Sequence, residues 1–369
     1  MVDRQRILED FFELVSFDSV SFSERKTADW VIARLTKLGF HVEEDQAGSV
    51  LKGSSGNIYG YLKGSIPGPP ILLSAHLDVV QPGIHKSAIL HEDGTITSTG
   101  ATVLGGDDIC GIVEIIEGIT ILKEQNIPHR DVEVIFSVAE EVYCKGIDAF
   151  DFSKIRAKEA YIFDFSGPVG SAAIQAPTIL SFEVAIQGIA SHAGFEPEKG
   201  VHSIALMSDF IHEIKQGYVD HETTLNIGTI SGGVATNIVP ESCRCSGEIR
   251  SYNHQKALEC MDMLRDIVKK IVDGTKGSFT IETRVHVEAY KLEETCQVVR
   301  RFKEACQQLK LSGGITKTFG GSDNNHFSSH GIPGIVLSCG MYQVHSVKEY
   351  TKVEDLEKGA LLVTELLKK

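Results

Sequence analysis

The chain has 369 residues, of which 42% are hydrophobic and 23% are charged, a balance typical of a folded globular protein. Its 50 acidic residues outnumber its 36 basic ones and give a formal net charge of −14, which excludes a general electrostatic attraction to nucleic acid or anionic lipid. At roughly 150 residues per domain, this length predicts about two or three domains.

The first half of the chain alternates between helix-like and strand-like segments. Apolar residues recur at helical spacing in three segments, residues 3–16, 24–38 and 112–125. Short apolar runs typical of buried strands occupy residues 71–75, 132–138 and 160–165. Strands interleaved with helices favour an α/β layer with a mixed, mostly parallel sheet.

The pattern changes near residue 178. From there to about residue 289, the order strand–helix–strand–strand–helix–strand is typical of a small α+β domain with one solvated sheet face. The α/β pattern resumes from about residue 290. We therefore predict one α/β domain built from residues 1–177 and 290–369, with a smaller α+β domain inserted at 178–289.

The eight cysteines show no C-x-x-C spacing, which predicts reduced thiols and a reducing compartment. Cys243 and Cys245 would face the same side of a strand, where a structural role is favoured over a metal site. The charged N-terminal segment lacks the apolar core of a signal peptide, and no stretch reaches the ~18 apolar residues of a membrane span. The expected location is the cytoplasm.

Acidic and histidine side chains follow the apolar runs, where ligands bind in open α/β sheets. These candidates are His76 and Asp78, Asp107 and Asp108, Glu140 and Glu141, Asp164, and His345. Imidazoles and carboxylates suit divalent cations such as zinc, cobalt or manganese. In such a site Asp78 could fix the tautomer of His76, and one residue of the Glu140–Glu141 pair could bind metal while the other acts as general base.

Each motif taken alone has a structural explanation. Glu140 and Glu141 could form a charged loop, and Asp107 and Asp108 could cap the helix that follows them. Their recurrence at consecutive strand ends favours a common site, because residues with unrelated structural roles would not all lie at one edge of a sheet.

The sequence resembles the co-catalytic di-zinc peptidases, the family that contains peptidase T, carboxypeptidase G and the aminoacylases. The segments that carry the resemblance are SAHLDVV, LGGDDICG, VAEEVYCKG, YIFDFSG, SHAGFEPEKG, TNIVPESCRCSGEIRS and VHSVKE. They keep the family's order across nearly the whole chain and are most similar to peptidase T-like proteins. The resemblance implies a zinc-peptidase-like catalytic domain with an inserted ferredoxin-like domain that acts as a lid and dimerisation domain.

The resemblance also implies two divalent metal ions per chain, most simply zinc, with cobalt or manganese as alternatives. His76 and Asp164 would hold one ion, Glu141 and His345 would hold the other, and Asp107 would bridge them.

The resemblance gives roles to five further residues. Glu140 would be the general base, and Asp78 would orient His76. From the lid, His192 would stabilise the oxyanion, while Asn237 and Arg250 would bind substrate. His192 and Asn237 would be supplied by lid closure or by a partner lid.

The chain departs from the family pattern at two places. The lysine of the DDKAG turn of peptidase T is Ile109 here, so any role of that lysine is lost. The glycine-rich loop reads FGGSDNNHF, in which His326 is an additional imidazole with a predicted structural or rim role. Asp108 and Asp323 are predicted to cap helices or to support the ligands.

The resulting hypothesis is a metal-dependent aminopeptidase that hydrolyses short peptides, as a tripeptidase does, through a metal-bridging water activated by Glu140. A dipeptidase, a carboxypeptidase or an N-acyl amino acid deacylase with the same site is the alternative, and a non-catalytic peptide-binding protein is a third. The expected partners are short peptides and a second copy of the chain through the lid domain, with no nucleic acid and no membrane.

Overall fold

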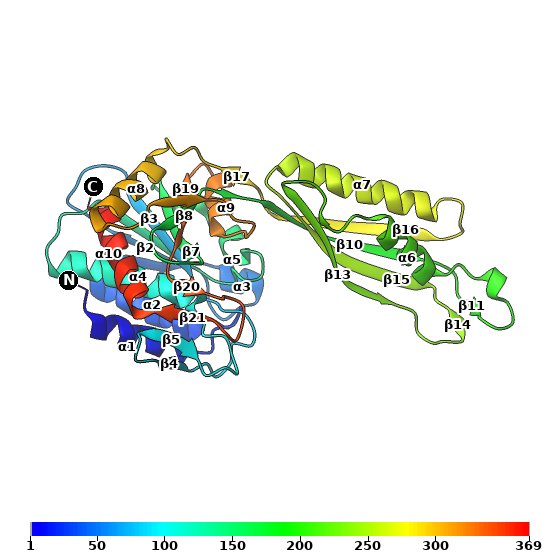
Figure 1. The fold of residues 1–369 in the computed structure, drawn as a ribbon, viewed down its shortest axis with the longest axis horizontal. Coiled ribbons are helices and arrows are strands. Elements are labelled where there is room, and N and C mark those ends of the chain that lie inside the picture. The colour runs from blue at the N-terminus through cyan, green and yellow to red at the C-terminus, as the bar shows by residue number, and fades with distance from the viewer. Residues whose placement is uncertain (1, 369) are drawn as a thin grey trace. The chain divides into compact units, whose positions relative to one another are not determined.

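The computed structural model describes residues 2–368, which form two compact units (Figure 1). The α/β unit consists of the chain up to Gln175, Lys291–Thr318, and the chain from Ser322 onward. The inserted unit consists of Ala176–Tyr290 and Phe319–Gly321. Each unit encloses its own apolar core.

An eight-stranded mixed sheet forms the centre of the α/β unit. Its strands, in spatial order, are β1 (His41–Glu44), β2 (Ile58–Leu62), β6 (Val132–Ser137), β3 (Ile71–His76), β7 (Ala160–Phe165), β19 (Gly334–Ser338), β8 (Ser171–Ala173) and β18 (Gly314–Thr316). The central pairs β6–β3, β3–β7 and β7–β19 are parallel. Every residue of β3 and β6 is buried, which explains why both read as apolar runs without alternation.

Helices cover this sheet. The longer ones are α1 (Arg4–Val15), α2 (Arg25–Leu38), α4 (Gly106–Glu124), α8 (Gln297–Leu309) and α10 (Val353–Leu367). The short ones are α3 (Ala47–Leu51), α5 (Lys145–Asp148), the 3₁₀ helix η1 (Phe152–Lys154) and α9 (Asp323–Ser329).

Helix α4 is the central helix of the α/β unit. It contacts β3, β7, α1 and α10, and its residues from Gly106 to Ile119 are all buried. The close approach to α10 requires a glycine at position 118, because a Cβ there would lie 2.5 Å from the Cβ of Val363. Asp107 and Asp108 have non-helical backbone angles, so the regular part of the helix begins at Ile109, directly after the two residues that the sequence places at its start.

A four-stranded antiparallel sheet brings the C-terminal part of the chain to the same unit. Its strands are β20 (Met341–Tyr342), β21 (Tyr350–Lys352), β5 (Thr95–Ser98) and β4 (Ala88–Leu90). The loop between β20 and β21 carries His345.

The inserted unit is an antiparallel sheet with two helices on it. The strands, in spatial order, are β12 (Gly217–Tyr218), β13 (Thr223–Gly232), β15 (Ser242–Ser251), β10 (Thr178–Gln187) and β16 (Ser278–Val287). Helices α6 (Ser203–Glu213) and α7 (His254–Val272) bury their apolar residues against this sheet. Its shorter elements are β11 (Ser191–His192), η2 (Pro197–Lys199) and β14 (Ile238–Val239). Strands β9 (Gln175–Ala176) and β17 (Tyr290–Lys291) pair with each other where the chain passes from one unit to the other.

The alternating burial along β10 is what a sheet with one covered face requires. Cys243 and Cys245 both point into the apolar core of this unit. The predicted fold class, a mixed and mostly parallel α/β domain with an inserted α+β domain, is confirmed.

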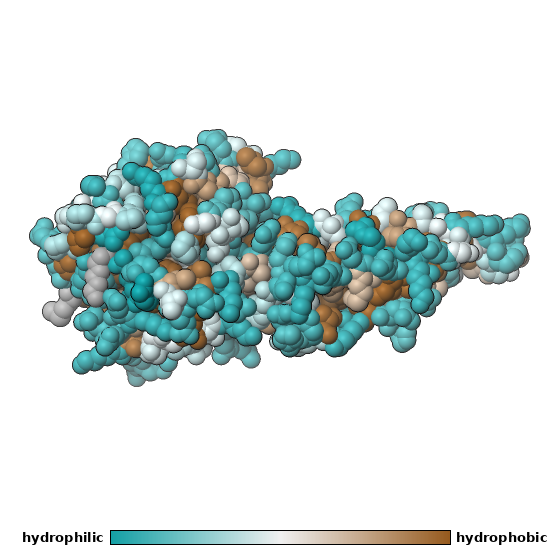
Figure 2. Space-filling view, turned by 90° about the horizontal axis from the view of Figure 1, so that it is seen from above, coloured by the Kyte–Doolittle hydropathy of each residue, from teal (hydrophilic) through white to brown (hydrophobic). Residues whose placement is uncertain are grey.

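The face drawn in Figure 2 is mostly polar in both units, with scattered apolar side chains. Among residues 2–368, no helix combines the length and apolar character that a membrane crossing would need.

Candidate metal centre

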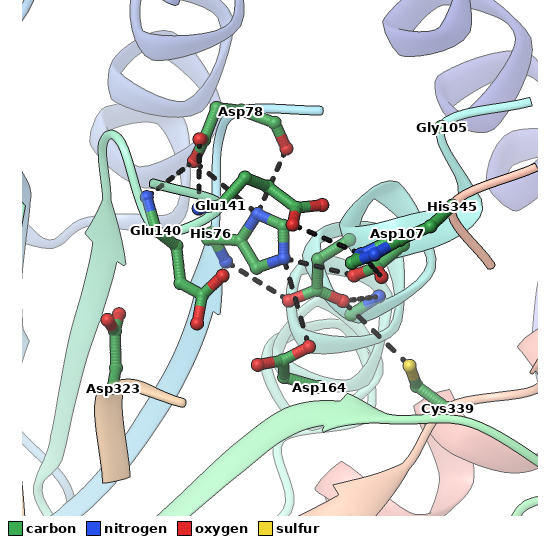
Figure 3. Close-up of polar contacts among 12 residues, drawn as sticks. His76, Asp78, Gly105, Asp107, Glu140, Glu141, Asp164, Asp323, Cys339 and His345 are labelled. Carbon is green, nitrogen blue, oxygen red and sulfur yellow. Dashed lines mark hydrogen bonds and ion pairs between the residues drawn. The ribbon is translucent and has the colours of Figure 1, made fainter. Parts of the chain in front are cut away.

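The predicted ligands converge at one edge of the central sheet (Figure 3). Parallel pairing places His76, at the end of β3, beside Ser137, at the end of β6. The loop after β6 then carries Glu140 and Glu141 to the same edge, and Asp164 lies near the end of β7. Asp107 comes from the first turn of α4, and His345 from the loop after β20.

Asp107 lies between the two histidines. Its Oδ1 is 3.0 Å from His76 Nε2, and its Oδ2 is 3.2 Å from His345 Nε2. The same nitrogen of His345 lies 3.1 Å from Glu141 Oε2, and His76 Nε2 lies 3.8 Å from Asp164 Oδ1. Each oxygen of one carboxylate therefore faces a different imidazole, as a bridging ligand between two cations requires.

Three groups of side chains place their ligand atoms within 4.8 Å of one another. The first is His76, Asp107 and Glu141; the second is His76, Glu140 and Asp164; the third is Glu140, Cys144 and Asp323. The first group consists of predicted ligands only. The second contains two predicted ligands, His76 and Asp164, together with Glu140, the predicted general base. The third contains none of the predicted ligands.

The tautomer of His76 suits cation binding. Its Nδ1–H donates to the backbone carbonyl of Asp78 at 2.9 Å, so the neutral ring presents a lone pair at Nε2. That lone pair faces Asp107 Oδ1, and two acceptors at 3.0 Å need a proton or a cation between them.

The ionisation of the two histidines shows how strongly this edge attracts positive charge. Hydrogen bonds to Asp107 and Glu141 raise the pKa of His345 to about 11. Burial opposes charge on His76, but its contacts with Asp107 and Asp78 outweigh burial and raise its pKa. Burial would raise the pKa of Asp107 as well, yet the two imidazoles hold it below its usual range.

The other carboxyl groups at this edge, those of Glu140, Glu141 and Asp164, are not neutralised by the two histidines. Burial, with the negative charge of neighbouring carboxylates, raises the pKa of Glu140, Glu141 and Asp164. Glu141 Oε1 is buried without a hydrogen-bond partner. Divalent cations would satisfy this donor set, so the residues fit the metals that the sequence implies.

Asp78 contacts His76 Nδ1, as predicted for a residue that fixes its tautomer, and does so through its backbone carbonyl. The nearer acceptor for His76 Nδ1 is its backbone carbonyl, while its Oδ1 is 3.5 Å from that nitrogen. The carboxylate instead accepts the backbone N–H groups of Glu140 at 2.9 Å and Glu141 at 3.2 Å, and the hydroxyl of Ser21 at 2.7 Å. It therefore fixes the loop that carries both glutamates.

Two buried acidic residues accept hydrogen bonds from the backbone of the predicted ligands and of the turn beside them. Asp108 accepts the backbone N–H of His76 at 3.0 Å, in agreement with its predicted supporting role. Glu349 accepts the N–H groups of Gly105 at 2.7 Å and Asp107 at 2.9 Å and so holds the turn before α4. Sequence reasoning assigned no role to Glu349, although it lies four residues after His345 in the segment VHSVKE.

His192 and Asn237 lie together in the inserted unit. Strand β11, which contains His192, pairs with β14, and the N–H of Ala193 donates to the carbonyl of Asn237 at 3.0 Å. His192 is exposed and stacks on Phe195 with ring centroids 4.3 Å apart.

Arg250 lies at the opposite end of this unit. It pairs with Ile179 at the start of β10, whereas His192 follows the end of that strand. Nine residues of extended strand separate these ends by roughly 27 Å. The Nε of Arg250 donates to Glu248 at 2.5 Å, and its Nη1 donates to the carbonyl of Phe319 at 2.8 Å. One inserted unit therefore does not bring His192 and Arg250 together.

Comparison with known proteins identifies the family. The chain is 34% identical over 367 residues to the uncharacterized protein YqjE of Bacillus subtilis, covering 100% of this chain and 99% of that one. Its structure matches an aminopeptidase PepT from Bacillus cereus with a TM-score of 0.91 at 33% identity, covering 100% and 98% of the two chains. A tripeptidase from Staphylococcus aureus matches with a TM-score of 0.95 at 30% identity and the same coverage. The chain belongs to the peptidase T-like peptidases.

Two family models also match this peptidase T-like chain. The model described as peptidase dimerisation domain matches residues 175–276, which lie almost wholly in the inserted unit. The model of peptidase family M28 matches residues 57–217, a range that contains the predicted site residues from His76 to Asp164. The family and the ligand clusters together support a hydrolase that uses divalent metal ions.

Proposed function

We propose that this peptidase T-like chain is an aminopeptidase that hydrolyses tripeptides and other short peptides with two zinc ions. The observation that carries the proposal is the position of Asp107, whose two carboxylate oxygens face His76 and His345. In this proposal, residues 1–177 and 290–369 form the catalytic domain and residues 178–289 form the lid.

The ligands divide into two sets around Asp107. His76 and Asp164 would hold one ion, and Glu141 and His345 would hold the other, with Asp107 shared between them. When bound, two such ions supply a water whose pKa is lowered toward about 7 and polarise the scissile carbonyl. Cobalt or manganese would serve the same mixed imidazole and carboxylate set.

Glu140 is the proposed general base. Its carboxylate lies in one group with His76 and Asp164 and in another with Asp323, and burial raises its pKa. It would accept a proton from the attacking water at a carboxylate oxygen and pass it to the nitrogen of the leaving amine, so that the proton taken in the first step is returned in the second. Asp78 fixes the backbone from which this side chain projects.

The inserted unit is proposed to bind the peptide. His192 would donate a hydrogen bond to the oxygen that becomes negative during attack, and Asn237 beside it would contact the substrate. Arg250 would hold the peptide carboxylate, which must compete with Glu248 for the guanidinium.

The separation of His192 from Arg250 favours a homodimer, in which His192 and Asn237 reach the site of the partner subunit. Several large apolar side chains of the inserted unit are exposed and could form such an interface: Phe195, Tyr218, Ile230 and Val234.

The test is a peptide panel assayed with the zinc-, cobalt- and manganese-loaded protein. A tripeptide with a free amino terminus should be hydrolysed at its first bond, and the same tripeptide with an acetylated amino terminus should be poor. Preference for the acetylated substrate would instead indicate a deacylase, and release of the C-terminal residue a carboxypeptidase. Fewer than one bound metal per chain, with no activity after metal addition, would favour a non-catalytic protein.

A further inference from the structure

A second cluster of potential ligands lies on the far side of Glu140 from the predicted metal ligands. Figure 3 shows the carboxylate of Asp323, at the start of α9, facing that of Glu140. Cys144 completes the group, with its Sγ 3.2 Å from Glu140 Oε1. We call these three residues the acid–thiol cluster; one ligand atom from each lies within 4.8 Å of the others.

The cluster contains an unsatisfied buried acceptor. Asp323 is 2% exposed, and while its Oδ2 accepts a hydrogen bond from Ser137 Oγ, its Oδ1 is buried without a hydrogen-bond partner. A buried oxygen left unpaired costs about 1–3 kcal/mol, so such an atom indicates a missing partner. Cys144 is 3% exposed and Glu140 9% exposed, which leaves Glu140 as the side from which a small ion can enter.

We infer that the acid–thiol cluster is a third cation site, which binds zinc or cadmium present in excess and thereby inhibits the enzyme. Two carboxylates and one sulfur suit a cation of borderline or soft character, because a thiolate binds zinc at about 2.3 Å and carboxylate oxygens bind it at about 2.0–2.2 Å. Small shifts of the three side chains would bring their ligand atoms to such distances.

Cation binding would replace the hydrogen bond between Cys144 and Glu140 with bonds from the cluster to the cation. The S–H bond of Cys144 breaks, its proton leaves to the buffer, and the sulfur forms a bond to the cation. The hydrogen bond from the thiol to Glu140 is lost, and the freed carboxylate oxygen becomes a ligand together with Asp323 Oδ1. A glutamate held in this way cannot accept a proton from water, so the inhibition rests on the proposed role of Glu140.

The sulfur gives the site a selectivity that the predicted catalytic ligands lack. Those ligands are imidazoles and carboxylates, which also accept manganese, whereas a thiolate favours zinc and cadmium. Excess cadmium or zinc should therefore inhibit the metal-loaded enzyme, and excess manganese should not.

The experiment titrates the manganese-loaded enzyme with cadmium. Bound cadmium per chain is measured by elemental analysis, sulfur–cadmium bonding by the charge-transfer absorption of the thiolate, and inhibition by the rate of peptide hydrolysis. Each rate is compared with that of the same variant before cadmium is added. The variants are Cys144→Ser and Asp323→Asn, and Cys260→Ser in the inserted unit is the matched control.

In the unchanged chain and in Cys260→Ser, cadmium should produce a thiolate absorption whose increase parallels the loss of activity. Cys144→Ser should remove that absorption. It should also raise the cadmium concentration for half-inhibition by roughly 100-fold, because loss of a direct ligand should cost at least as much as the 10–100-fold typical of an outer-shell partner. Asp323→Asn should keep the absorption but weaken binding. If Cys144→Ser leaves absorption and inhibition unchanged, the third site is wrong. If cadmium binds Cys144 in a chain with no peptidase activity, the third site stands and the proposed function fails.

Discussion

The carboxylate of Asp78 accepts the backbone N–H of Glu140 at 2.9 Å, while the backbone carbonyl of Asp78 accepts His76 Nδ1–H at the same distance. One residue therefore fixes a proposed ligand through its main chain and the proposed base through its side chain. The two functions can be separated by mutation, because a side-chain substitution leaves the carbonyl in place.

Asp78→Asn should lower kcat by about 10–100-fold, as is typical when a supporting partner of a metal site is lost. The amide nitrogen would face an N–H donor of Glu140 or Glu141, so the loop that carries the base would shift. Metal content should stay near that of the unchanged enzyme, because His76 keeps its acceptor. Steady-state kinetics and elemental analysis of the same sample measure the two effects.

The matched control for this variant is Ser21→Ala, which removes a different hydrogen bond to the Asp78 carboxylate and leaves the glutamate loop in place. Its kcat should change little. Loss of metal from Asp78→Asn with kcat per bound metal unchanged would show instead that the carboxylate itself orients His76.

Glu140→Gln and Glu141→Gln should separate catalysis from metal binding at adjacent positions. The first removes the proposed base and should lower kcat by about 10²–10⁴-fold while metal affinity persists. The second removes a proposed ligand that faces His345 at 3.1 Å and should release metal. Metal titrations and kinetics on both variants test this pair. Full activity in Glu140→Gln would remove that residue from the mechanism.

The positions of the ligands could be predicted because strand register brings them together. Buried parallel strands read as apolar runs, and the residues after them must share one edge of the sheet, so His76, Glu140 and Asp164 were predictable as neighbours. His345 could be expected near the same edge because it follows the apolar run of β19, a strand of the same sheet. Its distance from Asp107 could not be predicted, because a loop between two strands of a separate small sheet carries it.

Contacts that depend on side-chain direction could not be predicted. The pattern H-x-D does not tell whether the carboxylate or the carbonyl of Asp78 accepts from His76, since both lie two residues away. Glu349 acts through backbone N–H groups more than 240 residues earlier in the chain, for which sequence spacing gives no signal. The acid–thiol cluster likewise joins α9 to the loop after β6.

Glu349→Ala should weaken metal binding by about 10–100-fold, the usual cost of removing an outer-shell partner. The carboxylate is 1% exposed and holds the N–H groups of Gly105 and Asp107, so its loss frees the turn that aims the bridging carboxylate. Competition with a metal-binding dye measures the affinity. Glu354→Ala, on the exposed side of α10, is the control and should bind metal normally. Equal affinity in both variants would contradict the positioning role.

Removal of the metals should destabilise the α/β unit selectively. At a free metal concentration 100 times Kd, binding stabilises the folded state by about 2.7 kcal/mol, which corresponds to a Tm difference of about 5–10 °C. Calorimetry with and without a chelator measures the shift. Because each unit has its own core, a separate transition of the inserted unit should stay in place and serve as the internal control. Equal movement of both transitions would contradict this view.

Lys86 should make stability rise with pH in the alkaline range. Its side chain is 4% exposed and donates to the carbonyl groups of Phe17 and Gly83, and burial lowers its pKa to about 8 from an ordinary value of 10.5. Between these pH values the unfolded chain holds a proton that the folded chain has lost, so folding becomes more favourable as pH rises. The cost of burying the charge is fully present below pH 8 and disappears above about pH 10.5.

Lys86→Met removes this titration and keeps the length of the side chain. The free energy of unfolding of the unchanged protein, relative to Lys86→Met, should therefore rise by about 3 kcal/mol between pH 7 and pH 10.5. Denaturant titrations at a series of pH values measure the difference, and other alkaline groups cancel because both chains contain them. Lys37→Met, which removes a lysine at an exposed position of α2, is the control substitution. A difference that is flat or falls with pH would mean that Lys86 remains charged in the folded protein.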